Sequence, residues 1–101
     1  MGRLLNADTF EVRRITNVAS GTPVQGASRP VPDGIGVVVR AAATNTGVMT
    51  IGDSSANALN TGTRSTRLEN GDAVTLQVTN TDAIWADATV AGEYVELINE
   101  F

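Results

Sequence analysis

The stretch at residues 70–78 has the clearest pattern in this chain. Its apolar side chains recur at every second position, at Val74, Leu76 and Val78. A period of two residues predicts a β-strand with one dry face and one wet face. Asn70 and Gly71, directly before it, tolerate positive φ and are typical of a tight turn. We therefore expect the chain to reverse just before this strand, with the strand's partner close by in sequence.

Short apolar segments of the same kind recur along the chain between turns rich in Gly, Asn, Asp and Thr. Strands are expected at residues 9–18, 36–40, 48–51, 66–68, 73–78, 83–87 and 93–98. Many short strands at roughly ten-residue spacing are typical of a sandwich or barrel. The expected fold class is all-β, an antiparallel β-sandwich of jelly-roll or Ig-like type, with an extended N-terminal arm. Residues 36–40 and 48–51, on either side of a turn, are expected to form a hairpin.

Three segments have weaker patterns. Residues 9–18 change phase between Val12 and Ile15, which favours a bulged strand or two short extended pieces; a helix is the alternative. Residues 20–34 hold all three prolines, so an extended crossing or a long loop is expected there. The polar residues 52–64 are expected to form a surface loop. The expected organisation is one domain, with an extended arm and proline-rich crossing at residues 1–32 and a β-sandwich body at residues 33–101.

Composition limits the chemistry that the protein can perform. The chain of 101 residues has no cysteine and no histidine, and all seven of its basic residues are arginine. The commonest general base, thiolate metal ligands and Schiff-base lysines are therefore missing. Asp53 with its neighbouring serines is better interpreted as turn chemistry, and Glu93 and Glu96 have opposite strand parity, which argues against a carboxylate pair on one face. We expect no enzymatic activity, no cofactor and no metal site.

Charge is distributed unevenly. Residues 1–32 contain four arginines against Asp8 and Glu11, a net charge of +2, whereas the remainder has three arginines against nine carboxylates, a net charge of −6. An acidic body disfavours nucleic acid as a partner. No apolar run approaches the roughly 20 residues of a membrane span, and no export signal is evident.

The expected interface residues are Arg3, Leu4, Leu5, Phe10, Arg13, Arg14, Trp85 and Tyr94.

From Pro32 onward the order of elements resembles a group of small virion proteins of tailed bacteriophages. The resemblance is carried by the segments at residues 37–40, 45–47, 49–54, 59–63, 68–72, 74–78, 84–86 and 94–97. It implies a structural virion protein, a capsid decoration or cement protein that binds the major capsid protein on the capsid exterior after assembly in the host cytoplasm. A small head-fibre or tail component, or a carbohydrate-binding module that uses Trp85 and Tyr94, is the alternative.

The expected oligomer is a homotrimer. The resemblance implies it, since many decoration proteins of this kind are trimeric. A second reason is that Met49 and Ile51, and also Tyr94 and Ile98, lie on opposite parity to their better-patterned neighbours. A two-sheet sandwich buries one face of each sheet, so apolar residues on both faces need another subunit or a covering loop. A monomer whose residues 52–64 cover that face is the rival interpretation.

Overall fold

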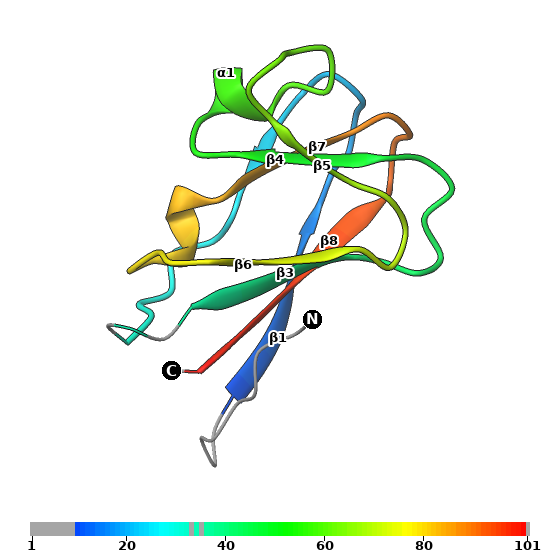
Figure 1. Ribbon diagram of the computed structural model, residues 1–101. Helices are drawn as coiled ribbons and strands as arrows, with labels where there is room; N and C mark the ends of the chain where they lie inside the picture. Colours follow the sequence, from blue (N-terminus) through cyan, green and yellow to red (C-terminus); the bar gives the residue numbers. More distant parts are fainter. Residues whose placement is uncertain (1–9, 33, 35, 101) are drawn as a thin grey trace.

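The computed structural model describes residues 10–32, 34 and 36–100, and its strands form two antiparallel sheets packed face to face (Figure 1). Sheet A has the order β1-β8-β3-β6 and sheet B the order β2-β7-β4-β5. The strands are β1 (Phe10–Thr16), β2 (Val24–Gln25), β3 (Val37–Ala41), β4 (Met49–Gly52), β5 (Thr66–Leu68), β6 (Ala73–Leu76), β7 (Trp85–Ala88) and β8 (Tyr94–Glu100). The expected all-β sandwich is confirmed.

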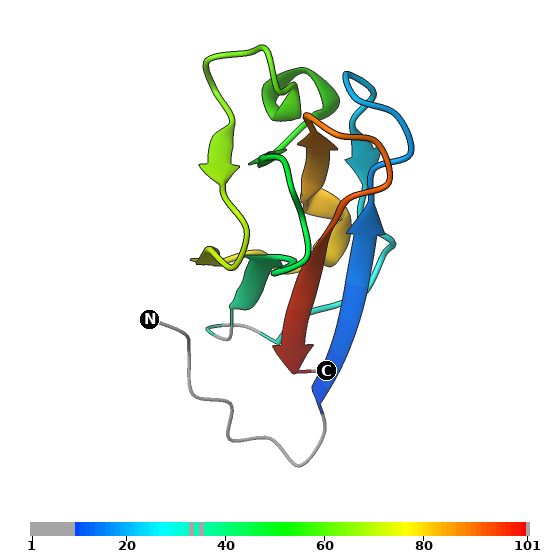
Figure 2. The same ribbon diagram turned by 90° about the vertical axis from the view of Figure 1, so that its right-hand side faces the viewer.

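The strands pair in a nested order. β1 pairs with β8, β2 with β7, β3 with β6 and β4 with β5, all antiparallel. The chain is thus one long hairpin, rolled so that successive pairs fall alternately into the two sheets. This is the jelly-roll arrangement, which distinguishes the two sandwich types left open by the sequence. Figure 2 shows the longest of these pairs, with β1 in blue beside β8 in red.

The expected arm boundary at residue 32 is wrong for the described residues. β1 pairs with β8 over an unbroken register from Phe10 opposite Glu100 to Thr16 opposite Tyr94. Ile15 also belongs to the buried core, as does Val31 beyond β2. Residues 10–32 are therefore part of the body, because their apolar side chains complete it. Residues 1–9 lie outside the described residues.

β1 is neither bulged nor helical. Phe10 and Val12 face outward and are about half exposed, at 54% and 51%, whereas Ile15 faces inward and is 2% exposed. The phase change in the sequence therefore marks a regular strand whose apolar side chains lie on opposite faces at its two ends. An edge strand that is covered only along part of its length produces this pattern.

Two expected local pairings are also wrong. β3 lies in sheet A and β4 in sheet B, so they do not form a hairpin. The Asn70-Gly71 turn, where Gly71 has a φ of 83°, likewise joins β5 of sheet B to β6 of sheet A. β6 is an edge strand whose partner is β3. A turn sequence requires the chain to reverse, but it does not determine which sheet the chain enters next.

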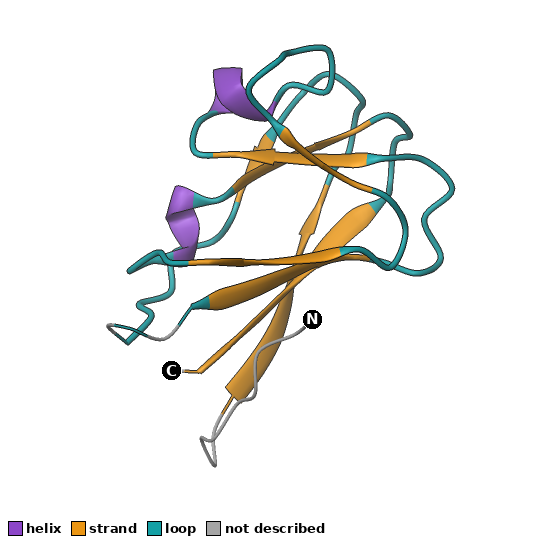
Figure 3. Cartoon of the chain, in the orientation of Figure 1, coloured by secondary structure: helices purple, strands orange, loops and turns teal. Residues whose placement is uncertain are grey.

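The outer face of sheet B is covered by residues 52–64, which are not merely a surface loop. They contain the short helix α1 (Ser55–Ala58), which begins where the side chain of Ser54 accepts a hydrogen bond from the backbone N–H of Asn57. Ala58 is fully buried, and the Thr50 hydroxyl donates to its carbonyl at 2.7 Å. This helix and the three-residue η1 (Thr81–Ala83) are shown in purple in Figure 3.

In the described part of the chain, no helix is long and apolar enough to cross a membrane.

A buried aspartate joins this cover to the sheet. Asp87, on the outer side of β7, is fully buried. Its Oδ1 accepts hydrogen bonds from the Asn17 side chain and from the backbone N–H groups of Gly21 and Ala88, at 3.2, 3.0 and 2.8 Å. Its Oδ2 accepts from the backbone N–H of Asn60 at 2.8 Å. One carboxylate therefore connects β7 to the turn after β1 and to the segment after α1.

Replacing this carboxylate should destabilise the protein strongly. Asp87→Ala removes the acceptor of three backbone N–H groups, and a buried donor without a partner costs about 1–3 kcal/mol. We expect the free energy of unfolding in a urea titration to fall by about 3–5 kcal/mol, and Asp87→Asn to lie between this variant and the parent. Asp53→Ala is the control, because Asp53 is exposed and bonds one side chain. Equal losses for Asp87→Ala and Asp53→Ala would contradict this role.

Candidate interaction surface

The outer face of sheet A carries an apolar row. Val12, Ile98 and Val38 lie in register on the neighbouring strands β1, β8 and β3. Phe10 precedes this row on the same face of β1, and Phe10 and Val12 are among the few large apolar side chains that are exposed in the described residues. In the part of the chain that the structure describes, no helix packs on this face. Val38 is nevertheless only 7% exposed, so Phe10 and Val12 are the members that are most available to a partner.

A charged row runs beside the apolar row. Arg14, Glu96 and Arg40 lie in register across the same three strands. The Arg40 guanidinium donates to Glu96 Oε1 through Nε and Nη2, at 3.0 and 2.6 Å. The Arg14 guanidinium lies 4.2 Å from the centre of the Tyr94 ring, within the range of a cation–π contact. These contacts hold three long side chains in defined positions, which lowers the entropy cost of binding a partner.

The structure brings together only some of the interface residues expected from the sequence. Phe10, Arg14 and Tyr94 share the outer face of sheet A. Arg13 has the opposite parity and lies on the inner side of β1, so Arg13 and Arg14 do not share a face. Arg3, Leu4 and Leu5 lie outside the described residues.

Arg13 belongs instead to an ion cluster at the end of the sandwich. Arg29 donates to both carboxylate oxygens of Glu11, at 2.8 and 2.9 Å, and Arg13 lies 3.7 Å from the same group. The hydrogen bond from Arg29 outweighs burial, and the two nearby positive charges and a hydrogen bond from Asn99 act in the same direction, so the pKa of Glu11 lies below its ordinary value of 4.5. This cluster fastens β1 to the segment after β2.

Trp85 lies on the other sheet. It pairs with Gln25 and Gly52 on the outer side of sheet B and is half-buried. The indole is therefore separated from Tyr94 by the thickness of the sandwich. The two aromatic residues that the carbohydrate-binding alternative would use do not form one platform.

Glu93 fastens the turn between β3 and β4. Its carboxylate accepts hydrogen bonds from the backbone N–H groups of Thr46 and Gly47 and from the Thr46 hydroxyl. Burial raises the pKa of Glu93, but these three hydrogen bonds together outweigh it, so the pKa is lower than the ordinary value of 4.5. Glu93 is thus a structural acceptor of hydrogen bonds.

The sequence did not single out four residues of the surface, namely Val12, Val38, Arg40 and Glu96. Their common property is cross-strand register, which depends on which strands are neighbours. The exposed parity of Val12 was visible from Phe10 and Val12 alternating on β1. The alignment of Arg40 with Glu96 could be known only after β3 had been placed beside β8.

The arrangement supplies binding surface and defined charges. Within the described ranges, no group of three or more acidic, histidine or cysteine side chains gathers in a form that could hold a metal ion. Comparison with known proteins gave no match among protein-family models, curated proteins or solved structures.

The two lowered pKa values predict a loss of stability in acid. A carboxylate whose pKa is lower in the folded state stabilises that state fully above its unfolded pKa and loses this effect as the pH falls through the folded pKa. We therefore expect the free energy of unfolding to fall as the pH drops below the ordinary glutamate value of 4.5, with Glu11 and Glu93 contributing.

Urea titrations of Glu93→Gln from about pH 7 to about pH 3 test the contribution of the Glu93 carboxylate. The variant should be less stable than the parent at neutral pH, and this difference should shrink in acid. Glu69→Gln is the control, because Glu69 is exposed. A difference between Glu93→Gln and the parent that is constant over the whole pH range would contradict the assignment.

Proposed function

We propose that this protein is a structural protein of a bacteriophage virion that binds the outside of the capsid and cements neighbouring major capsid subunits. The observation that carries the proposal is the outer face of sheet A, where the half-exposed Phe10 and Val12 belong to an apolar row beside an ordered row of alternating charge. Apolar cores with defined polar neighbours are typical of protein–protein interfaces. The role is non-catalytic.

The outer faces of the two sheets differ in how far they are covered, and this difference supports a binding role for sheet A. The outer face of sheet B is closed by α1 and by the hydrogen bonds of Asp87, whereas Phe10 and Val12 are half exposed on sheet A. Exposure of apolar side chains costs free energy in the isolated protein. A partner that covers them removes that cost, and the capsid surface is the partner that we propose.

The order of elements from Pro32 onward, which resembles that of small tailed-phage virion proteins, is the second support. Jelly rolls occur in viral capsid domains and also in lectins, so the fold alone does not select the function. A head-fibre or tail component would use the same apolar face. A carbohydrate-binding module is less well supported, because Trp85 and Tyr94 lie on different sheets.

Sedimentation tests the capsid role. In a density gradient of lysate from cells that produce the phage, the protein should sediment with DNA-filled heads at a fixed ratio to the major capsid protein. Val12→Asp should weaken the association about tenfold or more, because it places a charge in the apolar row. Val18→Asp is the matched control, since Val18 is a valine that is 77% exposed in the turn after β1.

Protein found only in the soluble fractions of that gradient would overturn the proposal. Sedimentation with detached tails would favour the tail alternative. Equal effects of Val12→Asp and Val18→Asp would show that binding does not use the outer face of sheet A.

We also propose a homotrimer, although the opposite parity of Met49 and Ile51 is no longer a reason for it. Met49 and Ile51 are core residues, 0% and 3% exposed, so they do not require another subunit. Tyr94 and Ile98 remain on the outer face of sheet A, where they lie opposite Thr16 and Val12. Three linked copies present three contacts at once, and linkage of this kind increases avidity about a hundredfold to ten-thousandfold.

Native mass spectrometry tests the trimer. At about ten micromolar, the purified protein should give a species of three times the 10.5 kDa chain mass. Val12→Asp should shift the distribution towards monomer if the apolar row lies between subunits, and leave it unchanged if the row faces the capsid. A single monomer peak for the parent protein, together with no threefold contact on the particle, would remove the trimer.

A further inference from the structure

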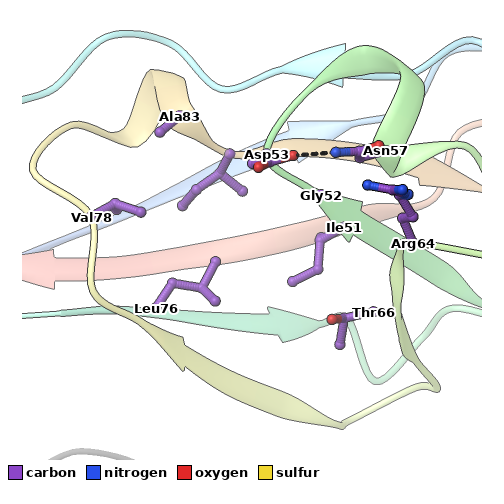
Figure 4. A pocket seen from close by; sticks show the side chains of 10 residues that line it. Ile51, Gly52, Asp53, Asn57, Arg64, Thr66, Leu76, Val78 and Ala83 are labelled. Atoms are coloured by element: carbon purple, nitrogen blue, oxygen red, sulfur yellow. Dashed lines mark hydrogen bonds between the residues drawn. The ribbon is translucent and has the colours of Figure 1, made fainter.

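The two sheets leave a cleft of about 510 Å³ between their edge strands β5 and β6. We call it the edge cleft; its lining includes Ile51, Asp53, Asn57, Arg64 and Leu76. In Figure 4, Ile51 and Leu76 point into the open space, and Asp53, Asn57 and Arg64 lie together along one rim. An apolar floor with a few polar groups at its margin, in a volume of several hundred Å³, is typical of a binding site.

β6, whose Leu76 lines the edge cleft, has a free strand edge. β6 pairs with β3 on one side and ends the strand order of sheet A on the other. The N–H of Ala41 donates to the carbonyl of Asp72 at 2.9 Å, so by antiparallel alternation Val74 and Leu76 also bond towards β3. Ala73 and Thr75 therefore direct their backbone groups away from the sheet. Proteins usually protect such edges with lysine, proline, a bulge or a covering segment, and neither Ala73 nor Thr75 is charged or proline.

Among the described residues that line the edge cleft, Arg64 is the one positively charged side chain. Arg64 makes no ion pair with any described residue. Asp53 also lies at the rim, and its Oδ1 accepts a hydrogen bond from Asn57 Nδ2 at 2.7 Å. Arg64 is thus the cation of the rim, and a carboxylate of a ligand is the group that it would bind.

We propose that the edge cleft binds an extended segment of a partner protein, which adds to β6 as a new strand, inserts an apolar side chain between Ile51 and Leu76, and directs a carboxylate at Arg64. Addition of a strand satisfies the free backbone groups of Ala73 and Thr75, and the pockets beside it select alternate side chains. Side chains two residues apart share one face of a strand, so the apolar residue and the acidic residue are separated by one position. This inference rests on the cleft alone and does not require the virion role.

A peptide titration tests the inference on the full chain. The probe is the blocked peptide acetyl-Thr-Leu-Thr-Glu-Thr-amide, and its matched control carries glutamine in place of glutamate. In ¹⁵N-edited NMR spectra, the probe should shift the amides of Ala73 and Thr75 in a saturable way at concentrations up to about 1 mM, and the control peptide should bind about tenfold more weakly.

Two variants localise the binding. Arg64→Glu should weaken binding of the probe about tenfold or more, whereas Arg67→Glu should change it less than about twofold, because Arg67 lies on the outer face of β5 opposite Thr50. Thr75→Pro should abolish binding while it keeps the ladder with β3, since proline removes an N–H that faces away from that ladder. The dispersion of the NMR spectrum reports that each variant is folded.

Three kinds of result would overturn the inference. The first is a failure of the titration, either as no saturable shift at β6 or as equal binding by the parent and Arg64→Glu. The second is a shift of the Ala73 and Thr75 amides with protein concentration in the absence of peptide, which would assign this edge to a second copy of the chain. The third is saturation of the cleft by decanoate without binding of the peptide, which would assign it to a small amphiphile.

Discussion

The ladder between β1 and β8 is the interaction on which the rest of sheet A depends. It joins Phe10 to Glu100, the two ends of the described chain, and β8 then supplies its other edge to β3. The apolar and charged rows of the outer face exist because β8 lies between β1 and β3. Contacts between residues so far apart in sequence require the closure of long loops. The chain loses this conformational entropy before the strands gain free energy from packing against each other. The candidate surface accordingly depends on pairings between distant strands, not on any local segment.

The sequence was informative where burial follows a simple period. Val95 and Leu97 are buried and alternate with outward residues on β8, and Val37 and Val39 are buried on the inner face of β3. The sequence was less informative about which strands pair with each other. Short connections from β3 to β4 and from β5 to β6 look like hairpin turns, yet each carries the chain to the opposite sheet. Local turn chemistry is the same in both cases, and the choice is made by which distant strands complete the core.

The candidate surface was predictable in part for the same reason. Phe10, Arg14 and Tyr94 could be selected by residue type, and they do share a face. Arg13 could not be separated from Arg14 without knowing where β1 begins its regular alternation. The buried role of Asp87 was equally hidden, because its partners come from segments that are separated from it by up to 70 residues. Polar residues at such positions carry no period, and only the folded arrangement shows what they bond.

The antiparallel geometry of β1 and β8 also sets how the protein responds to mechanical load. The start of β1 lies opposite the end of β8, so the two strands leave the sandwich at the same end. Tension applied between these two points would act on one pair of hydrogen bonds at a time and peel the strands apart, as a zipper opens. Tension applied between the start of β1 and the turn before β8, which lies at the far end of the ladder, would load all the bonds of that ladder together in shear. The domain is therefore mechanically anisotropic, and the place where a partner holds it decides which resistance it shows.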